Sequence, residues 1–182
     1  MALKSTIFKA VLEIADIDRP YYQTHSLTIA RHPSETDERM MVRLLAFTLH
    51  ADEYLNFGKG ISSEGEPDIC IKDLTGSIDT WIDVGLPDEK LVRRACGQAK
   101  RVFIYTYGGR AADLWWTQNR DKLERNDNLA VVNIPLEISR ALADLAQRNM
   151  QLQCTIQESM IWFNQGDATV AIELSQVKTL AS

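Results

Sequence analysis

The stretch that most constrains the fold is residues 67–87, where two β-like runs flank a short turn. The runs read PDICIKD and SIDTWIDVG, and each alternates apolar with polar residues as a half-buried strand does. A two-residue turn at Thr75-Gly76 joins them into an antiparallel hairpin with its isoleucines on one face. On the other face the expected opposed pairs are Asp68 with Asp83, Cys70 with Trp81, and Lys72 with Asp79.

Two carboxylates held opposite each other on adjacent strands repel unless a positive charge lies between them. Mg²⁺ binds carboxylate oxygens at about 2.1 Å and keeps waters that can attack a phosphoester. Asp68 and Asp83, with the Val84 carbonyl, are therefore candidate ligands of Mg²⁺ or Mn²⁺, and Glu35 or Glu38 would complete the shell. The ordinary alternative is a pair of solvated surface carboxylates, with Glu35 stabilising a helix N-terminus.

The rest of the chain predicts an α/β protein with one mixed β-sheet and flanking helices. Alternating runs at 4–14 and 24–31 predict a hairpin, and Ser34 is the expected N-cap of a helix that extends to about Tyr54. A second helix opens at Pro87-Asp88. The remaining expected elements are a strand at 102–108, a helix at 110–123, a strand parallel to the first at 129–134, a helix at 135–147 and three further alternating runs at the C-terminal end.

The composition limits which partners the protein can bind and indicates where in the cell it acts. The 182 residues fit one domain, and they carry 20 Lys and Arg against 25 Asp and Glu, a net charge of −5. Bulk charge therefore excludes a polybasic nucleic-acid binder, so contact with nucleic acid needs a local basic patch. Three scattered cysteines and the absence of a long apolar run predict a reducing compartment and no membrane partner. We expect a cytoplasmic protein.

Other side chains have both an ordinary and a functional interpretation. Trp81 could stack on a base, but a tryptophan covered by a helix is the commoner outcome. The basic residues around Arg93 and Arg101 are interpreted as the solvated face of a helix rather than a phosphate-binding patch. Cys96 lies near arginines that would lower the pKa of an exposed thiol, but it falls next to the apolar stripe of its helix, and no histidine can be placed beside it as a base.

Pro67-Asp68 followed by Asp83-Val84-Gly85 resembles the PD-(D/E)XK nuclease pattern, in which a lysine two residues after the second carboxylate assists the attacking water. Here that position is Gly85. Lys72, Lys90 and Gln98 are the residues that can replace the lysine. Because some branches of that superfamily carry a glutamine in the following helix, the resemblance favours Gln98.

Several segments, taken together, resemble the YaeQ family over essentially the whole chain. They are MALKSTIFKA, RHPSETDERMMVRLLAF, GLPDEK, the pair Trp115-Trp116, and CTIQESMIWF. This resemblance implies a variant of the restriction-endonuclease-like fold and a bacterial cytoplasmic origin. The leading hypothesis is a metal-dependent phosphodiesterase of the nuclease type that acts on nucleic acid. A small-phosphoester hydrolase is a further possibility, and the alternative from another class is a non-catalytic nucleic-acid- or protein-binding module on the same scaffold.

Overall fold

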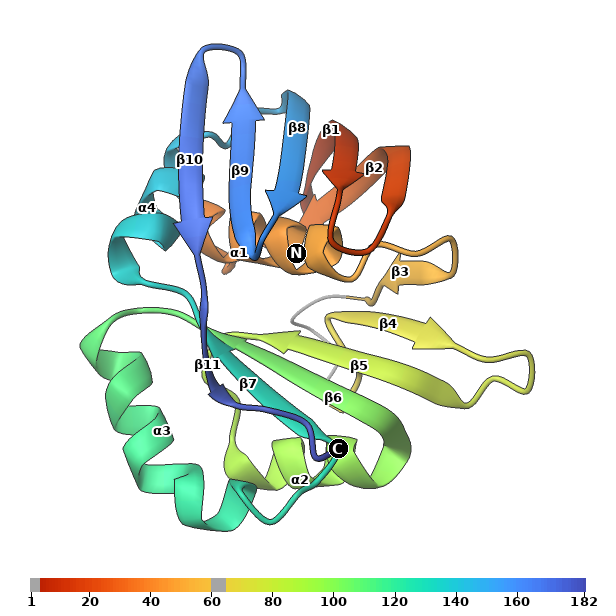
Figure 1. Cartoon of the computed structure of the whole chain (residues 1–182), viewed down its shortest axis with the longest axis vertical. Coiled ribbons are helices and arrows are strands. Elements are labelled where there is room, and N and C mark those ends of the chain that lie inside the picture. The colour runs from red at the N-terminus through yellow and green to blue at the C-terminus, as the bar shows by residue number, and fades with distance from the viewer. Residues whose placement is uncertain (1–3, 60–64) are drawn as a thin grey trace. The chain divides into compact units, whose positions relative to one another are not determined.

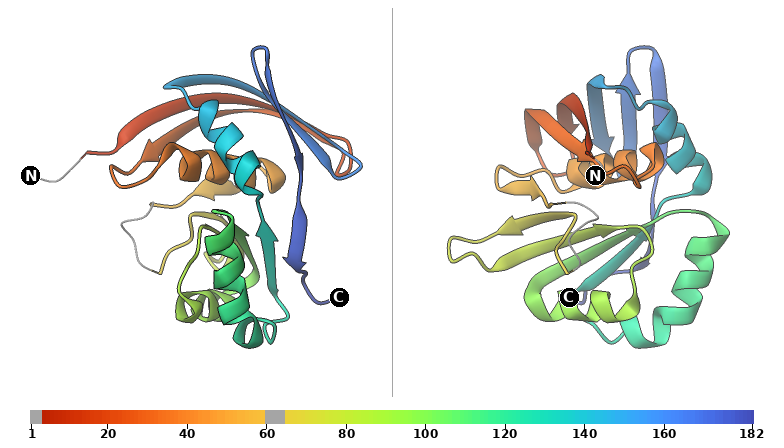
Figure 2. Two further views of the ribbon diagram at one scale, coloured as in Figure 1. Left: turned by 90° about the vertical axis from the view of Figure 1, so that its left-hand side faces the viewer. Right: turned by 180° about the vertical axis from the view of Figure 1, so that it is seen from behind.

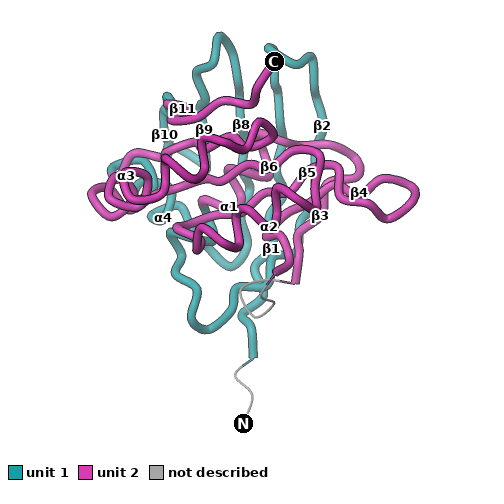
Figure 3. Tube along the Cα trace, turned by 90° about the horizontal axis from the view of Figure 1, so that it is seen from below, with its two compact units in different colours: residues 1–41, 137–174 teal, residues 42–136, 175–182 magenta. Residues whose placement is uncertain are grey.

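The computed structural model describes residues 4–59 and 65–182, which form two mixed β-sheets and the helices α1 to α4 (Figure 1). The chain divides into two compact units (Figure 3). Unit 1 contains residues 1–41 and 137–174, and unit 2 contains residues 42–136 and 175–182. The α/β class is therefore confirmed, but the expected single sheet is wrong because the two sequence hairpins belong to different sheets.

Unit 1 is built on a five-stranded sheet in the order β10-β9-β8-β1-β2. The N-terminal hairpin forms as predicted, and its first strand also pairs in parallel with a strand from the C-terminal third of the chain. That long-range pairing separates this hairpin from the other sheet. The strand bounds are β1 Thr6–Asp16, β2 Tyr21–Arg31, β8 Asn149–Gln157, β9 Met160–Gln165 and β10 Ala168–Glu173.

The core of unit 1 lies on one face of this sheet. Alternate residues of β1, β8 and β9 are buried, as their sequence alternation predicts, and Leu12, Leu152 and Phe163 are at most 1% exposed. Helix α4, Leu136–Asp144, lies on this face and buries Ser139 and Leu142 (Figure 2). The opposite face of the sheet carries mostly exposed polar side chains.

Helix α1, Asp37–Leu49, is shorter than expected at both ends. The hydroxyl of Thr36 accepts a hydrogen bond from the backbone N–H of Arg39 at 3.1 Å, so Thr36 is the N-cap. Ser34 instead bonds to the ring of His32 at 2.6 Å. The helix stops well before Tyr54 because the apolar residues beyond it belong to the short strand β3, Leu55–Phe57.

Unit 2 is built on a six-stranded sheet in the order β11-β7-β6-β5-β4-β3. Strands β5, β6 and β7 are parallel and are connected through helices, as the strand-helix-strand pattern predicts. Strands β3 and β11 have no counterpart in the sequence analysis because each is very short. The bounds are β4 Ile69–Lys72, β5 Ile78–Val84, α2 Glu89–Gln98, β6 Ala99–Thr106, α3 Arg110–Leu123, β7 Leu129–Asn133 and β11 Ser175–Lys178.

Helices α2 and α3 contribute to one hydrophobic core with alternate residues of β5, β6 and β7. Trp81, Val102 and Val131 from the strands lie in this core. Polar side chains also cap the two ends of α2. The Asp88 carboxylate accepts a bond from the Lys90 N–H at 2.8 Å, and the Asn128 side-chain amide donates to the carbonyls of Cys96 and Ala99 at 2.9 and 3.0 Å.

Candidate functional site

The 67–85 hairpin has the predicted register at its open end and a different register at its tip. Ile69 faces Ile82 and Cys70 faces Trp81, which is the predicted pairing. At the tip, the Asp73 N–H donates to the Ser77 carbonyl at 2.9 Å. The loop is therefore the three residues between Asp73 and Ser77, not the two-residue turn expected. A β-bulge in β5 absorbs the extra residue and restores the register.

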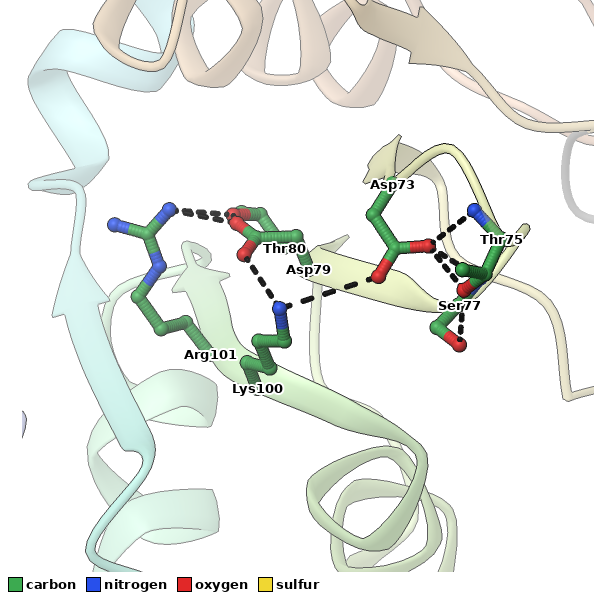
Figure 4. Close-up of polar contacts among 7 residues, drawn as sticks. All are labelled: Asp73, Thr75, Ser77, Asp79, Thr80, Lys100 and Arg101. Carbon is green, nitrogen blue, oxygen red and sulfur yellow. Dashed lines mark hydrogen bonds and ion pairs between the residues drawn. The ribbon is translucent and has the colours of Figure 1, made fainter.

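The bulge places Asp79 away from Lys72, so the predicted pair of these two residues is wrong. Lys72 faces Ile78 instead. The Asp79 carboxylate accepts hydrogen bonds from Arg101 Nη2 at 2.8 Å and from the Thr80 hydroxyl at 2.9 Å (Figure 4). These hydrogen bonds, that of Arg101 first, lower the pKa of Asp79 below its usual value.

The bulge cluster, formed by Asp73, Asp79, Lys100 and Arg101, joins the hairpin to β6. Lys100 Nζ lies 4.0 Å from Asp73 Oδ2 and 3.8 Å from Asp79 Oδ1 (Figure 4). Asp73 also accepts bonds from the backbone and hydroxyl of Thr75, and these bonds lower its pKa. Lys100 and Arg101 therefore form ion pairs on strand β6, so the predicted placement of these two residues on the solvated face of a helix is wrong.

Asp68 and Asp83 lie opposite each other, and hydrogen bonds to their carboxylates hold the two strands of the hairpin together. We call this pair of residues and its hydrogen bonds the clasp. The backbone N–H of Asp68 donates to Asp83 Oδ1 at 3.1 Å, and the backbone N–H of Val84 donates to Asp68 Oδ2 at 2.8 Å. The indole N–H of Trp81 donates to Asp83 Oδ2 at 2.8 Å. Two backbone donors and one buried ring donor thus point at the two carboxylates.

Protein donors take up part of the hydrogen-bonding capacity of these two carboxylates. Both oxygens of Asp83 already accept hydrogen bonds from protein donors, and Asp68 is only 8% exposed. No group of three or more His, Cys, Asp or Glu residues in the described ranges is placed to hold a metal ion. Since Mg²⁺ is usually held by one or two carboxylates together with waters and substrate phosphates, binding of a metal ion by Asp68 and Asp83 stays a prediction.

The two glutamates expected to complete a metal shell have partners in unit 1, whereas the hairpin belongs to unit 2. Glu35 is 6% exposed and accepts a bond from Arg39 Nη1 at 3.0 Å. Glu38 faces inward, and its carboxylate accepts a bond from the hydroxyl of Ser139 in α4 at 2.6 Å. A role for either residue beside the hairpin carboxylates stays a prediction.

The backbone conformation at Gly85 explains why a glycine occupies the lysine position of the nuclease pattern. Its φ is +108°, a conformation that residues with a side chain rarely adopt, and its N–H donates to the Tyr105 carbonyl at 2.9 Å. No atom lies within 4 Å of the place that a Cβ would occupy, so the restriction comes from the backbone and not from crowding. The bend between β5 and α2 therefore disfavours a lysine at this position.

Lys72 and Gln98, two of the candidate replacements for the missing lysine, line the same pocket. We call it the hairpin pocket; it has a volume of about 520 Å³ and lies within unit 2. Its wall is formed by residues within β3 and on both sides of it, by the segment around Pro67, by the hairpin strands and by the end of α2. The lining residues are Tyr54, Asn56, Phe57, Gly58, Lys59, Gly65, Glu66, Pro67, Cys70, Lys72, Ile78, Trp81 and Gln98.

Cations outnumber anions around the hairpin pocket. Lys59 and Lys72 line it with Glu66, and Lys59 Nζ lies 3.7 Å from Glu66 Oε1 in a solvent-exposed pair. Arg94 Nη1 lies 3.2 Å from the place where a Cβ on Gly65 would lie, so a third cation borders the pocket. An exposed ion pair contributes little, so Lys59 is still available to a ligand.

The pocket also has an aromatic side. Tyr54 is 59% exposed and lines the pocket, so its ring is accessible to a ligand. Trp81 is 3% exposed and belongs to the core, which confirms the interpretation of this residue as covered by the fold. Neither Tyr54 nor Lys59 was predicted as a pocket residue, and Tyr54 was expected at the end of a helix.

The cysteines do not provide a nucleophile. Burial raises the pKa of Cys96 to about 11 and that of Cys154 to about 12, and it also raises the pKa of Cys70, which lines the pocket. A lowered pKa was expected for Cys96 only if its thiol were exposed, and the thiol is partly buried. Burial dominates instead, because a thiolate is poorly solvated in the core.

These features define a class of protein: a mixed α/β chain of two sheets in which a clasped hairpin and a helix end form a pocket. In the described ranges no helix has the length and hydropathy of a membrane span.

Comparison with known proteins places the chain in a family. The profile described as "YaeQ protein" matches residues 1–174. A relative from Escherichia coli (strain K12), named "Uncharacterized protein YaeQ", is 44% identical over 175 residues, which are 96% of this chain and 97% of the relative. The corresponding protein of Salmonella typhi is 45% identical over the same length. The chain belongs to the YaeQ family.

Solved structures agree with this assignment. The crystal structure of the YaeQ protein from Xanthomonas axonopodis pv. citri matches with a TM-score of 0.93 and 42% identity, covering 98% of this chain and 99% of that one. The YaeQ protein from Pseudomonas syringae matches with a TM-score of 0.92 and 30% identity, covering 96% of this chain and 97% of that one.

Proposed function

We propose that the protein is a non-catalytic binding module and that the hairpin pocket holds one phosphate-bearing nucleotide of a single-stranded nucleic acid. The observation that carries this proposal is the convergence of Lys72, Gln98 and Tyr54 on one pocket of about 520 Å³. A lysine supplies charge to a phosphate, an aromatic ring stacks on a base, and an amide can donate to or accept from a base edge.

The state of the hairpin carboxylates supports binding over hydrolysis. Asp68 and Asp83 hold backbone N–H groups, so they stabilise the wall of the pocket rather than a metal ion. The cations at the pocket rim supply the local basic patch that an acidic chain needs to contact nucleic acid. A restriction-endonuclease-like core used for binding alone, in the cytoplasm, is part of the same proposal.

The test is an anisotropy titration of fluorescently labelled single-stranded DNA and RNA oligonucleotides in EDTA. We expect micromolar binding that weakens with salt, and Lys72→Met should weaken it about fivefold and reduce the salt slope by about one. Lys9→Met removes the same charge from β1 of unit 1 and should leave the affinity within twofold. Absence of binding by the wild type, or equal losses in the two variants, would overturn the proposal.

A second candidate is the metal-dependent phosphodiesterase, in which Asp68 and Asp83 bind Mg²⁺ or Mn²⁺ with the Val84 carbonyl. One observation favours it: the Asp68 backbone N–H donates to the Asp83 carboxylate, so the two residues lie side by side across the hairpin, next to Pro67 in the pocket wall. In this case Gln98 or Lys72 would position the attacking water. Cleavage of the same oligonucleotides in Mn²⁺, lost in Asp83→Asn, would favour the enzyme over the binding module.

A further inference from the structure

The outer face of the unit 1 sheet, opposite the face on which helix α4 lies, carries few charges for a chain of this composition (Figure 2). The charged side chains that its five strands turn to this face are Lys9, Glu13 and Glu173, although a quarter of the whole chain is charged. Amides and hydroxyls take the place of charges. The residues of this kind on the face are Asn149, Gln151, Gln153, Gln157 and Asn164 with Thr24, Ser26, Thr28, Thr155 and Thr169. The face therefore offers many hydrogen-bond donors and acceptors and little net charge.

Two adjoining pockets lie on this face within unit 1, with volumes of about 240 and 370 Å³. They share Val11 and Gln151, so together they extend along β1 from Lys9 to Glu13, about 13 Å at the rise of a strand. We call them the sheet pockets. The other lining residues whose side chains point outward are Ser26, Thr28, Asn149, Gln153 and Asn164.

The polar side chains that line the sheet pockets are not used to hold the fold together. Within residues 4–59 and 65–182, the side chains of Glu13, Gln151 and Gln153 form no hydrogen bond or ion pair with another residue. The Oδ1 atom of Asn164 is buried and has no hydrogen-bond partner in the same ranges. Because a buried polar atom normally has a partner, a hydroxyl group of a bound molecule is a suitable donor to this oxygen once the amide turns toward the pocket.

The chemistry of the lining fits a neutral ligand that is rich in hydroxyl groups. An amide side chain donates through its nitrogen and accepts through its oxygen, and a sugar hydroxyl also does both, so each group can satisfy the other. The charges of Lys9 and Glu13 cancel, so the sheet pockets lack the excess of cations that a phosphate backbone requires. Val11 is the single apolar side chain that the lining residues turn outward, whereas an interface with a protein has an apolar core.

We propose that the sheet pockets bind a neutral oligosaccharide, with the amides of Gln151, Gln153 and Asn164 as hydrogen-bond partners of its hydroxyl groups. Gln151 lines both pockets and therefore contacts successive sugar units, and the Glu13 carboxylate accepts a bond from a hydroxyl at one end. Trp162 lies two residues before Asn164 on the same face, about 7 Å along the strand, and its half-buried ring can cover the apolar side of a sugar ring. The proposal does not depend on the hairpin pocket, which lies in unit 2.

The test is a titration of the isotope-labelled full chain with maltotetraose, cellotetraose and chitotetraose, followed by NMR of the backbone and side-chain amides. We expect at least one of these saccharides to shift the side-chain amide signals of Gln151, Gln153 and Asn164 in a saturable way, with a dissociation constant on the order of a millimolar or below. The backbone amides of residues 9–13 should shift with them. The amides of the hairpin pocket should stay where they are.

A matched pair of variants assigns the shift to the sheet pockets. Gln151→Leu removes an amide that lines both pockets and keeps the size of the side chain, so it should weaken the affinity about fivefold. Gln157→Leu makes the same change on the same strand and the same face, outside the sheet pockets, and should leave the affinity within twofold. The dispersion of the amide signals checks that each variant is folded.

Several results would overturn the proposal. The first is the absence of a saturable shift with all of these saccharides at about 20 mM, well above the expected dissociation constant. Equal losses of affinity in the two variants would overturn it as well, because the shift would then not come from the sheet pockets. Shifts of the same amides by tetrathymidylate or by a neutral peptide of serine and glycine, with none from the saccharides, would assign the face to a nucleic acid or to a protein instead.

Discussion

The backbone N–H of Asp68 donates a hydrogen bond to the carboxylate of Asp83 at 3.1 Å, across the open end of the hairpin. In return, the Asp68 carboxylate accepts a bond from the residue after Asp83, Val84, at 2.8 Å. Two residues that the sequence pattern suggested as metal ligands therefore hold the two strands together. A carboxylate that accepts backbone N–H bonds can stabilise a fold without any metal ion.

Replacing Asp83 with asparagine tests the clasp. Both oxygens of Asp83 accept bonds, whereas an asparagine amide offers one acceptor oxygen and one donor group, so either Asp68 N–H or the Trp81 indole loses its partner. We expect Asp83→Asn to lower the free energy of unfolding by about 1–3 kcal/mol in urea denaturation. Asp88→Asn is the matched control, because asparagine caps a helix as well as aspartate does. Equal stabilities of the two variants would contradict the clasp.

Gly85 provides a test of why the lysine of the nuclease pattern is missing. Because its φ is +108°, Gly85→Ala should cost about 1–2 kcal/mol of unfolding free energy, and Gly85→Lys should cost at least as much. Gly97→Ala, within helix α2 and equally uncrowded, should raise stability by about 0.5–1 kcal/mol. If Gly85→Lys left thermal stability unchanged, the backbone would not explain the missing lysine.

The ion pairs of the bulge cluster should make the free energy of unfolding depend on pH in the acidic range. The pKa of Asp79 is lowered from 3.8 in the folded state, so its contribution to stability is fully present above pH 3.8 and is lost as the pH falls through the lower folded value. Asp79→Asn should therefore be less stable than the wild type at pH 7, by a small amount because the pair is exposed to solvent. The difference should shrink steadily at pH values below 3.8. A difference that persists there would mean that the charge of Asp79 is not its cause.

The thiols should be unreactive in the folded protein. With a pKa of about 11, Cys96 has far less thiolate at pH 8 than an ordinary thiol, and burial hinders access to Cys70 and Cys154. A disulfide-exchange reagent such as dithionitrobenzoate should react with the native chain on the order of a hundredfold more slowly than with glutathione. In guanidinium chloride all three cysteines should react quickly. Fast reaction of the native chain would show that the core around Cys96 opens readily.

Local patterns predicted the hairpins and most helices, because alternation and capping act over a few residues. The N-terminal hairpin, helix α3 and the open end of the 67–85 hairpin formed as expected. The tip of that hairpin did not, since a three-residue loop followed by a bulge gives the same final register as a two-residue turn. The sequence shows no sign of which arrangement is adopted, and the partner of Asp79 changed as a result.

Local sequence patterns could not predict which strands far apart in the sequence pair with each other. The pairing of β1 with β8 joins residues about 140 positions apart, and it puts the N-terminal hairpin in a sheet of its own. The hairpin pocket was hard to foresee for the same reason. Its candidate residues Lys72 and Gln98 were singled out, but the part played by Tyr54 depends on a three-residue strand, β3, that carries no periodic signal.

The central claim is that the hairpin carboxylates form a closed structural clasp beside a metal-independent binding pocket. Calorimetric titration of Mn²⁺ into the wild type, with Asp83→Asn in parallel, tests it most directly, because neither titration requires a known nucleic-acid ligand. We expect no saturable heat in either protein up to millimolar Mn²⁺. Saturable binding by the wild type that Asp83→Asn removes would contradict the account and assign the site to a metal ion.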